Sequence, residues 1–510
     1  MKSTQRVHTI IVGAGAAGAI IAARLSERSD HTVLLIEAGP DYPNADLAPR
    51  ELRDGTRNAK LTHDWGLSEK PTPEQIPFEF PRGRVVGGSS AVNTCIALRG
   101  QQSDFDEWAS RGLSHWSYDE CLPAFKRLET DLDVRSPWHG DDGPIRIRRF
   151  KSHQWSPWQA GLCDASRALG FSYSEDLNAP VASGFGEMPF NMIDGVRQSA
   201  ARCYLTADVR ARENLTIRAN TLVRRVIFDK RRAVGVEVER DNVVSTLYAD
   251  KIVLCGGAIM TPCILWRSGV GPKATLEKLK VTTVSENAHV GARLLDHPGT
   301  GIFVIPRSLE NSKYTLMQTC LRYSTTGGHF ANDAQIQAGN FFWAPRIEAP
   351  VMGLMMTLEK PRGTAGRITL RDADPHTLPT IDANFLADSW DRNAMVEGLE
   401  LLHLLASTSP MREQIAMFLH PRPRKMRDRT HLNEYLPTAC GSGYHPSGSV
   451  PMGSDDDLEA ATDGYGRVRG TEQLIVADAS LFPTITSANI HLPTLMIGER
   501  MGAWLRDGVV

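Results

Sequence analysis

A glycine-rich turn near the start restricts the fold of this chain more than any other feature. Residues 9–18 read Thr-Ile-Ile-Val-Gly-Ala-Gly-Ala-Ala-Gly, and a helical pattern follows over residues 19–29. Gly13 permits a tight turn, Gly15 lets the backbone approach a pyrophosphate, and Gly18 lets a helix lie close to the preceding strand. Free amides and the helix dipole at such a turn attract phosphate. The stretch therefore predicts a strand, a turn and a helix N-terminus that form a dinucleotide cradle.

A second apolar segment supports this interpretation. Residues 32–36 read Thr-Val-Leu-Leu-Ile and are followed by Glu37. Dinucleotide-binding folds place an acidic residue about 20 positions after the glycines, where its carboxylate holds the ribose hydroxyls. Glu37 has this spacing, so we expect it at the end of the second strand, with the ribose as its partner.

Length and charge limit the class of partner. A chain of 510 residues is too long for one ordinary core, so two connected domains are expected. With 57 basic and 59 acidic residues and a net charge of -2, the chain has no overall field that attracts nucleic acid or an anionic membrane. We therefore expect a small-molecule partner and no nucleic acid.

The spacing of the cysteines and the length of the apolar runs narrow the class of protein further. The eight cysteines contain no C-x-x-C, which argues against a zinc site or a disulfide framework and predicts free thiols. The first expected strand begins within about ten residues of Met1, and no run of about 18 apolar residues occurs. These features predict a soluble cytoplasmic protein without a membrane span.

A second glycine-rich turn follows a long irregular stretch. Residues 39–72 are rich in Pro, Asp, Asn and Arg with little periodicity, and long loops of this kind are often functional. Residues 81–93 then read Pro-Arg-Gly-Arg-Val-Val-Gly-Gly-Ser-Ser-Ala-Val-Asn. Backbone amides and short hydroxyls at such a turn form an anion-binding nest. The chain therefore has two expected sites for phosphate or another anionic group.

Two longer motifs resemble those of a known family. Residues 83–93 resemble the first signature of the glucose-methanol-choline (GMC) oxidoreductases. Residues 257–271, Gly-Ala-x-x-Thr-Pro-x-Ile-Leu-x-x-Ser-Gly-Val-Gly, resemble the second signature and follow an expected strand at residues 251–255. Shorter likenesses at residues 138–144 and 290–298 extend the resemblance over nearly the whole chain.

The resemblance implies an α/β fold in which a Rossmann-type FAD-binding domain carries an inserted, antiparallel-sheet α+β substrate domain. The expected FAD-binding domain comprises residues 1–150, 196–298 and 440–510, and the substrate domain comprises residues 151–195 and 299–439. FAD is expected rather than NAD because the segments Gly87-Gly88-Ser89-Ser90 and the stretch ending at Asp478 hold the rest of the larger cofactor in the family.

Local patterns predict several further elements. Residues 214–239 contain three short runs in which apolar residues alternate with others: Leu-Thr-Ile-Arg, Val-Arg-Arg-Val-Ile-Phe and Ala-Val-Gly-Val-Glu-Val. They predict a small antiparallel layer. Residues 390–407 carry apolar side chains at 3-to-4 spacing, which is typical of a helix with one buried face. The basic, proline-interrupted run over residues 420–429 is interpreted as a solvated loop rather than an anion site. We also expect a buried strand over residues 474–477 and a helix over residues 495–506.

Two histidines in the last part of the chain are the candidate catalytic residues. His445 falls on the family's His-Pro-x-Gly motif, whose histidine faces the flavin N5 region. Aligning Asn489, Pro493 and Thr494 places His491 where family members carry a second catalytic His or Asn. A neutral imidazole can accept the hydroxyl proton as hydride leaves the carbon, while the other imidazole holds the alcohol oxygen. The resemblance thus implies His445 as base and His491 as its hydrogen-bonding partner, without a metal.

The resemblance also implies a set of cofactor contacts. Val223 is the candidate to pack beside the adenine. The full expected FAD-binding set is Gly13, Gly15, Ala16, Ala17, Gly18, Glu37, Ala38, Arg84, Val86, Gly87, Gly88, Ser89, Asn93, Thr94, Val223, Gly257, Asp478, Ala479, His491, Pro493 and Thr494.

The activity that the resemblance implies is oxidation of a small, primary or aromatic alcohol to the aldehyde, by hydride transfer to flavin N5. A redox-neutral hydroxynitrile-lyase-type reaction and a dehydrogenase with a non-oxygen acceptor stay open as alternatives. A light-driven decarboxylase and a flavin-binding protein without catalysis both leave the histidine pair without a role. Tyr444, the run at residues 341–343 and the methionine-rich stretch at residues 351–358 are candidate walls of the substrate pocket. The sequence leaves open the alcohol, the electron acceptor and the oligomeric state.

A prediction about cofactor attachment follows from residue 92. Some family members bind flavin covalently through a histidine directly before the signature Asn, and here that position is Val92. Because valine has no nucleophile, FAD should be noncovalent, and acid precipitation of the yellow protein should release it into the supernatant. Flavin absorbance that stays with the precipitated protein would contradict this prediction.

Overall fold

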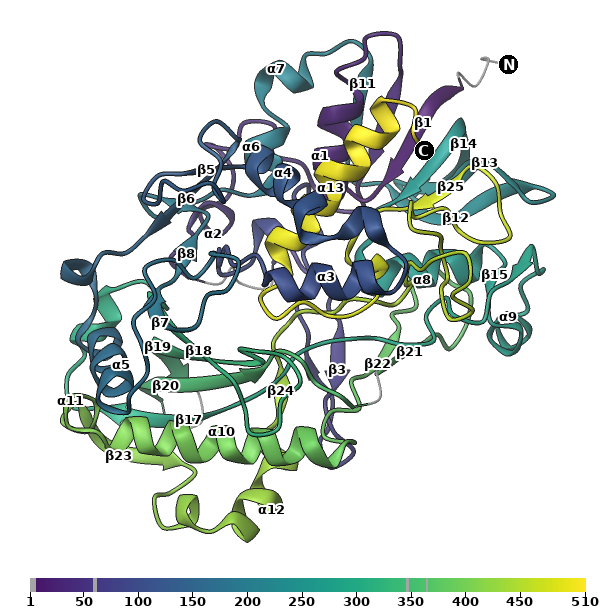
Figure 1. Ribbon diagram of the computed structural model, residues 1–510. Coiled ribbons are helices and arrows are strands. Elements are labelled where there is room, and N and C mark those ends of the chain that lie inside the picture. Colours follow the sequence, from purple (N-terminus) through teal and green to yellow (C-terminus); the bar gives the residue numbers. More distant parts are fainter. Residues whose placement is uncertain (1–5, 58–61, 345–347, 364–365) are drawn as a thin grey trace.

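A computed structural model describes residues 6–57, 62–344, 348–363 and 366–510, and only the backbone of residues 343 and 344. Two large sheets organise the chain, one mostly parallel and one antiparallel (Figure 1). Within the described residues, no helix is long and apolar enough to cross a membrane. All eight cysteines are free thiols, as their spacing predicts.

The first sheet has a parallel part with the order β11-β2-β1-β14-β25. Its strands are β11 (Leu215–Arg218), β2 (Val33–Ile36), β1 (Val7–Val12), β14 (Val243–Leu254) and β25 (Leu474–Val476). The first half of β14 leaves this part and pairs antiparallel with β13 (Arg232–Arg240), which pairs with β12 (Leu222–Asp229). One long strand therefore joins the parallel layer to a small antiparallel layer.

Helices cover the parallel layer, and two of them pack closely. In Figure 1, α13 (His491–Arg506) lies beside α1 (Ala16–Leu25). A Cβ atom on Gly498 would lie only 3.0 Å from the Cα atom of Ala17, so a glycine is needed for this approach. The buried carboxylate of Glu499 also accepts hydrogen bonds from Arg24 and Tyr204. The last helix of the chain is thereby fixed on the first.

The second sheet has the order β23-β17-β20-β19-β18-β7, with β24 paired to β17. Its strands are β7 (Gly184–Glu187), β17 (Pro298–Pro306), β18 (Thr319–Tyr323), β19 (Ala334–Ala344), β20 (Ala349–Leu358), β23 (Ile415–His420) and β24 (Gly441–Ser442). The helix α10 (Ser389–Ser407) packs across β17 and β20, below the sheet in Figure 1. α5 (Pro157–Ala168) packs on β18 and β19.

Along the strands of the second sheet, successive side chains point alternately to a buried core and to a cavity. Ile302, Ile336 and Leu354 are buried in the core that α10 helps to form. Their neighbours in sequence, such as Phe303 and Gln337, line a cavity on the opposite face. Because successive side chains of a strand point to opposite faces, the same strands supply a core and a cavity wall.

Shorter elements connect the two sheets. They are α2 (Arg50–Arg53), β3 (Ser68–Lys70), β4 (Phe78–Glu79), α3 (Gln102–Ser110), α4 (Tyr118–Leu128), β5 (Glu129–Asp131), β6 (Ile145–Arg149), β8 (Pro189–Phe190), β9 (Met192–Ile193), β10 (Val196–Arg197), α6 (Ala200–Tyr204), α7 (Ala207–Arg210), α8 (Gly257–Arg267), β15 (Val270–Gly271), α9 (Lys273–Leu279), β16 (Ser285–Glu286), β21 (Arg367–Thr369), β22 (Thr380–Asp382), α11 (Ser409–Arg412) and α12 (Arg429–Ala439).

Several predicted elements are confirmed, and some have different limits. The helix expected at residues 390–407 is α10, which the side chain of Asp388 caps. α1 begins at Ala16 and ends at Leu25 rather than spanning residues 19–29, since the Asn214 amide binds the carbonyl oxygens after its last turn. α13 begins at His491 instead of residue 495, because Pro493 lies in the first helical turn, where no amide donor is needed.

One expectation for the antiparallel layer is wrong. The run Leu-Thr-Ile-Arg forms β11, which pairs parallel to β2 at the edge of the first sheet. Apolar alternation is the same in a parallel edge strand and in an antiparallel strand, so the pattern did not distinguish them. The other two runs form β12 and β13 and are antiparallel as predicted. The basic run near residue 425 is largely exposed, as expected for a solvated loop.

The glycine-rich turn lies where backbone segments meet. Gly13 has a φ of 99°, and a Cβ atom there would overlap the carbonyl oxygen of Cys255. A Cβ atom on Gly18 would overlap the carbonyl oxygen of Gly13. In contrast, the nearest protein atom to a Cβ on Gly15 is the Cα atom of Gly88, 4.0 Å away. Gly13 and Gly18 are therefore needed by the fold, whereas Gly15 leaves space that the protein does not fill.

This contrast generates a matched pair of predictions. Gly18→Ala should lower the free energy of unfolding of FAD-free protein by about 1 to 3 kcal/mol. The energetic cost of the overlap with the Gly13 carbonyl oxygen exceeds the stabilisation of about 1 kcal/mol that alanine gives over glycine in a helix. Gly15→Ala should change it by less than about 1 kcal/mol but reduce the bound FAD, since its methyl group enters the cradle. Urea unfolding and the ratio of flavin to protein absorbance measure the two effects. Equal loss of stability in both variants would refute this assignment.

Candidate active site

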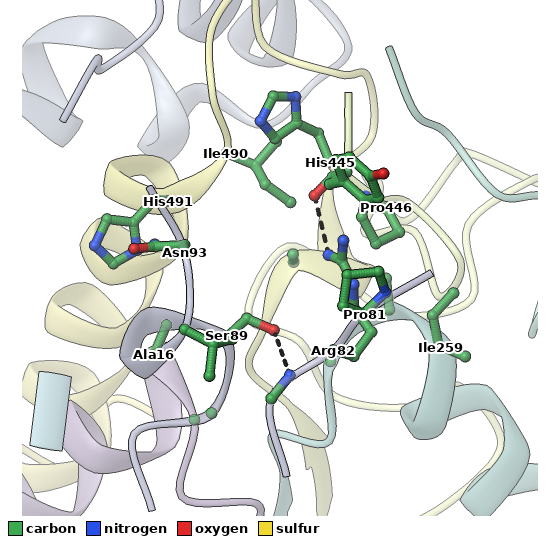
Figure 2. Close-up of a pocket in the computed structure, with 18 of the residues that line it drawn as sticks. Ala16, Pro81, Arg82, Ser89, Asn93, Ile259, His445, Pro446, Ile490 and His491 are labelled. Carbon is green, nitrogen blue, oxygen red and sulfur yellow. Dashed lines mark hydrogen bonds between the residues drawn. The ribbon is translucent and has the colours of Figure 1, made fainter. Parts of the chain in front are cut away.

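A cavity of about 630 Å³ lies between the first sheet and the second. Its walls come from the β1–α1 turn, the glycine-rich segment after β4, the start of α8 and one face of β17, β19 and β20. β24 and the segment after it, the residues after β25 and the segment before α13 complete them. Figure 2 shows Arg82, His445 and Pro446 on one side of the cavity and Ala16, Asn93 and His491 on the other. The cavity thus reaches from the cradle to both candidate catalytic residues.

Most of the predicted site residues line this cavity. Those that do are Gly13, Gly15, Ala16, Ala17, Glu37, Ala38, Gly88, Ser89, Asn93, Thr94, Val223, Gly257, His445, Asp478, Ala479, His491 and Thr494. Gly18, Arg84, Val86, Gly87 and Pro493 do not. Gly18 and Gly87 instead serve the turn geometry, and the Arg84 guanidinium lies over the Trp65 ring, 5.0 Å from its centroid.

Backbone amides hold the two acidic residues of the predicted cofactor set. Glu37 accepts hydrogen bonds from the amides of Ala14, at 3.0 Å, and Gly39, at 2.9 Å, and burial raises its pKa to about 7. Asp478 accepts a hydrogen bond from the amide of Gly257 at 2.8 Å and from the hydroxyl of Thr261 at 2.7 Å. Each carboxyl group therefore fixes a turn that borders the cavity.

These features fit a dinucleotide cofactor. The N-terminal ends of α1 and α8 both border the cavity, and such ends favour phosphate through their free amides and the helix dipole. The free space beside Gly15 allows a ligand to approach the backbone directly. Glu37 lies at the end of β2, where the dinucleotide fingerprint requires an acid for the ribose. The residues present thus match an FAD-sized ligand that extends toward the histidines.

His445 has polar partners on three sides. Its backbone amide donates to the Asp296 carboxylate at 2.8 Å. Its Nε2 atom lies 2.9 Å from the side-chain nitrogen of Asn489, and its Nδ1 atom lies 2.9 Å from Nδ1 of His297. Burial lowers the pKa of His445 below 6.5, and the neighbouring His297 and Arg82 act in the same direction. The His445 ring is therefore neutral at pH 7.

His491 is the first residue of α13 and lines the cavity. Its Nε2 atom is buried and has no hydrogen-bond partner among the described residues. Burial lowers the pKa of His491 to about 4, and Arg197 acts in the same direction. A neutral imidazole with a free ring nitrogen therefore borders the cavity and can bind a polar ligand atom.

The opposite wall is mostly apolar. Phe303, Phe342 and Met355 line the cavity, and Gln335 and Gln337 add amide groups between them. Of the predicted pocket walls, Tyr444, Phe342, Met355 and Met356 line the cavity, Phe341 lies under the Arg57 guanidinium, and the side chain of residue 343 is outside the described residues. An apolar wall with a few amides suits a small ligand with an uncharged body.

Sequence reasoning missed three residues of the site. Asp296, His297 and Asn489 contact His445 directly. Their motifs were visible, because Asp296 and His297 precede a proline and Asn489 lies next to the predicted His491 segment. No sequence signal indicated that residue 297 meets residue 445, since 148 positions separate them.

A second group of potential ligands lies away from this cavity. The side chains of Glu129, Asp131 and His139 come close enough together to hold a metal ion. Arg99 already pairs with Glu129, and Arg149 pairs with Asp131 at 2.7 Å. The two guanidinium groups supply the positive charge that a cation would bring, so the arrangement is a buried ion-pair network.

Comparisons with known proteins agree with the geometry. The sequence matches the GMC oxidoreductase family over residues 7–299 and again over residues 361–498. It is 33% identical to a 5-(hydroxymethyl)furfural oxidase of Methylovorus sp. (strain MP688), over 96% of this chain and 97% of that protein. It is 29% identical to an oxygen-dependent choline dehydrogenase of Photobacterium profundum, over 96% of this chain and 91% of that protein.

The fold is also that of a solved structure. Pyridoxine 4-oxidase from Mesorbium loti superposes with a TM-score of 0.89 at 27% identity, covering 98% of this chain and 99% of that one. Family matches over both parts of the chain and a relative that covers nearly all of it agree with the cradle and the cavity described above. The chain therefore belongs to the GMC oxidoreductase family and is an FAD-dependent oxidoreductase that acts on alcohols.

Proposed function

We propose that this protein oxidises a small primary or aromatic alcohol to the aldehyde, with His445 as the base and His491 as the partner of the alcohol oxygen. The observation that carries the proposal is the pair of neutral imidazoles at one cavity. His491 presents a ring nitrogen without a partner, and Nε2 of His445 faces only the Asn489 side chain. The third histidine that lines the cavity, His63, differs from this pair, because both of its ring nitrogens have partners, in Tyr42 at 2.8 Å and Glu51 at 3.0 Å.

The two imidazoles have separate tasks in this proposal. FAD, when bound, supplies a ring that accepts a hydride from the alcohol carbon. His445 is neutral, because burial lowers its pKa below 6.5, and in this proposal it takes the hydroxyl proton at Nε2. His491 donates a hydrogen bond from Nε2 to the alcohol oxygen and thereby holds the alcohol in place. The apolar wall of Phe303, Phe342 and Met355 excludes water from the reacting atoms.

The cofactor contacts belong to the same proposal. The predicted set that borders the cavity holds FAD without a covalent bond, because Val92 lines the cavity with a side chain that cannot attach flavin. Glu37 binds the ribose, and the turns at Gly15 and Gly88 bind the pyrophosphate. The proposed electron acceptor is oxygen or another small oxidant.

The reaction class can be tested by anaerobic titration of the holoenzyme. 5-(Hydroxymethyl)furfural, choline, pyridoxine and benzyl alcohol form a suitable panel, three of them taken from the names of the relatives. We expect at least one of them to bleach the flavin absorbance, and admission of air then tests whether oxygen restores it. A protein that cleaves cyanohydrins while no alcohol bleaches its flavin would be a lyase, and the proposal would be wrong.

The roles of the two histidines generate a second prediction. His445→Ala should slow flavin reduction by about 100-fold to 10,000-fold while FAD stays bound, because a positioned acid-base group contributes that much. His491→Asn should lose clearly less, since an amide still donates a hydrogen bond to the alcohol oxygen. His491→Ala should be worse than His491→Asn, because the oxygen then lacks its partner.

Stopped-flow flavin reduction at saturating alcohol measures these rates, with FAD content determined for each variant. His431→Ala is a matched control, because His431 lies on α12 and does not line the cavity. If His491→Asn were the most damaging change and His445→Ala were mild, the two roles would be exchanged.

A further inference from the structure

A second histidine and a carboxyl group lie behind His445, away from the cavity. His297 immediately precedes β17 and is fully buried, with its ring centroid 5.0 Å from that of His445. Glu359 immediately follows β20 and is 1% exposed. Neither residue lines the cavity. Any effect they have on the reaction must therefore pass through His445.

The hydrogen bonds of His297 leave one arrangement of protons. Its Nε2 atom lies 3.0 Å from the backbone carbonyl oxygen of Thr486, which can only accept, so Nε2 carries the hydrogen. Burial lowers the pKa of His297 to about 4, so the ring is neutral at pH 7 and its Nδ1 atom holds a lone pair. That lone pair lies 2.9 Å from Nδ1 of His445 and 3.3 Å from a carboxyl oxygen of Glu359, which cannot donate when it is ionised, so Nδ1 of His445 is then the donor.

This arrangement determines the tautomer of His445. Since Nδ1 of His297 accepts, Nδ1 of His445 must donate and carry its hydrogen. In the neutral ring the lone pair is then on Nε2, and the Asn489 amide, whose nitrogen lies 2.9 Å away, can donate to it. Nε2 of His445 is also the atom that the proposed function needs as a base. A chain of three hydrogen bonds, beginning at Thr486, therefore specifies the reactive form of His445.

Glu359 completes the group on the side away from the cavity. One carboxyl oxygen accepts the Thr357 hydroxyl at 2.5 Å. The other has no hydrogen-bond partner among the described residues and lies 3.3 Å from Nδ1 of His297. An ionised carboxylate there would stabilise positive charge on the His297 ring at a buried position, where such interactions are strong.

We propose that His297 and Glu359 are positioning residues of the alcohol oxidation, which keep the lone pair of His445 on Nε2, where the alcohol hydroxyl replaces the Asn489 amide as its donor, and take up the charge that His445 gains. The inference rests on the proposed function of His445. The proton of the alcohol hydroxyl goes to Nε2 of His445. The proton on Nδ1 of His445 moves to Nδ1 of His297, beside the Glu359 carboxylate. His445 thus gains one proton and passes one on, and the hydride leaves separately with its electron pair. We call the group of His445, His297 and Glu359 the relay.

The relay also predicts a pH dependence. Below about pH 7 the Glu359 carboxyl is protonated, since burial raises its pKa to about 7. Its hydroxyl then competes with Nδ1 of His445 for the single lone pair of His297. The charged groups that face the relay are Asp296, Lys360 and Asp104 around His297, Arg322 and Asp104 around Glu359, and Arg82 and His297 around His445. The rate of flavin reduction should therefore fall as the pH drops through about 7.

Glu359→Gln tests the carboxylate, because an amide keeps the size of the side chain and cannot ionise. At pH 8 the variant should reduce its flavin about 10-fold to 100-fold more slowly than the wild type, the range found for carboxylates that orient metal-ligating histidines. The fall in rate near pH 7 should disappear. KM should stay unchanged, because Glu359 does not line the cavity. Asp391→Asn is the control, since Asp391 is a buried carboxyl that binds the amides of Arg362 and Gly363.

His297 is tested with two substitutions. His297→Ala removes the acceptor for Nδ1 of His445 and should lower the rate about 100-fold. His297→Asn places an amide oxygen near the former Nδ1 position, so it should restore the tautomer and recover part of the rate. A Glu359→Gln variant with the wild-type pH profile, or a His297→Asn variant no faster than His297→Ala, would overturn the proposal.

A spectroscopic measurement separates this proposal from the proposed function. Protonated and unprotonated ring nitrogens of histidine give separate ¹⁵N signals, and the difference between wild type and His445→Ala identifies those of His445. We expect Nδ1 of His445 to be protonated in the wild-type holoenzyme and the two tautomers to mix in His297→Ala. A protonated Nε2 in the wild type would refute the relay. If no alcohol of the panel reduced the flavin while Nδ1 was protonated, the proposed function would fail, and with it the role in alcohol oxidation, while the assigned tautomer of His445 would stand.

Discussion

The rest of this structure depends on the contact of three backbone turns at one point. A Cβ atom on Gly13 would overlap the carbonyl oxygen of Cys255, and a Cβ atom on Gly88 would lie 2.7 Å from the Cα atom of Gly15. The turns after β1, before α8 and after β4 therefore meet without side chains between them. Because they meet so closely, the N-terminal ends of α1 and α8 border one cavity rather than two. The cofactor cradle is a consequence of backbone contact, and the side chains of Glu37 and Asp478 then fix the turns.

The last part of the chain brings the two proposed catalytic histidines to this cradle. α13 packs on α1, and its first residue is His491. The position of His491 is therefore fixed by the same helix pair that supports the glycine-rich turn. His445 is held differently, through Asp296 and His297 at the start of the second sheet. His491 thus belongs structurally to the first sheet and His445 is tied to the second, so the relative position of the two sheets determines the distance between the two histidines.

The sequence predicted those features that are encoded locally. The glycine turn, the acid at the end of β2 and the apolar face of α10 all lie within short segments, and their spacing is determined by strand and helix geometry. The pairing of β11 was not predictable, because alternation does not distinguish a parallel edge from an antiparallel partner. The contact of His297 with His445, and of Glu359 with His297, joins segments that are far apart in sequence and depends on how the two sheets close. The domain division and the roles of the site residues stay predictions.

Burial of the histidines and burial of the carboxyl groups have opposite effects on how the stability of the protein changes with pH. The pKa values of His297 and His491 are lowered to about 4, so the unfolded state binds more protons at these rings between pH 4 and 6.5, and their contribution to stability rises with pH. The pKa values of Glu37 and Glu359 are raised to about 7, so the folded state binds more protons at these groups between pH 4.5 and 7, and their contribution falls with pH. The two contributions oppose each other in the range where they overlap. The buried neutral imidazoles of this site are thus combined with carboxyl groups that offset part of the acid sensitivity those imidazoles bring.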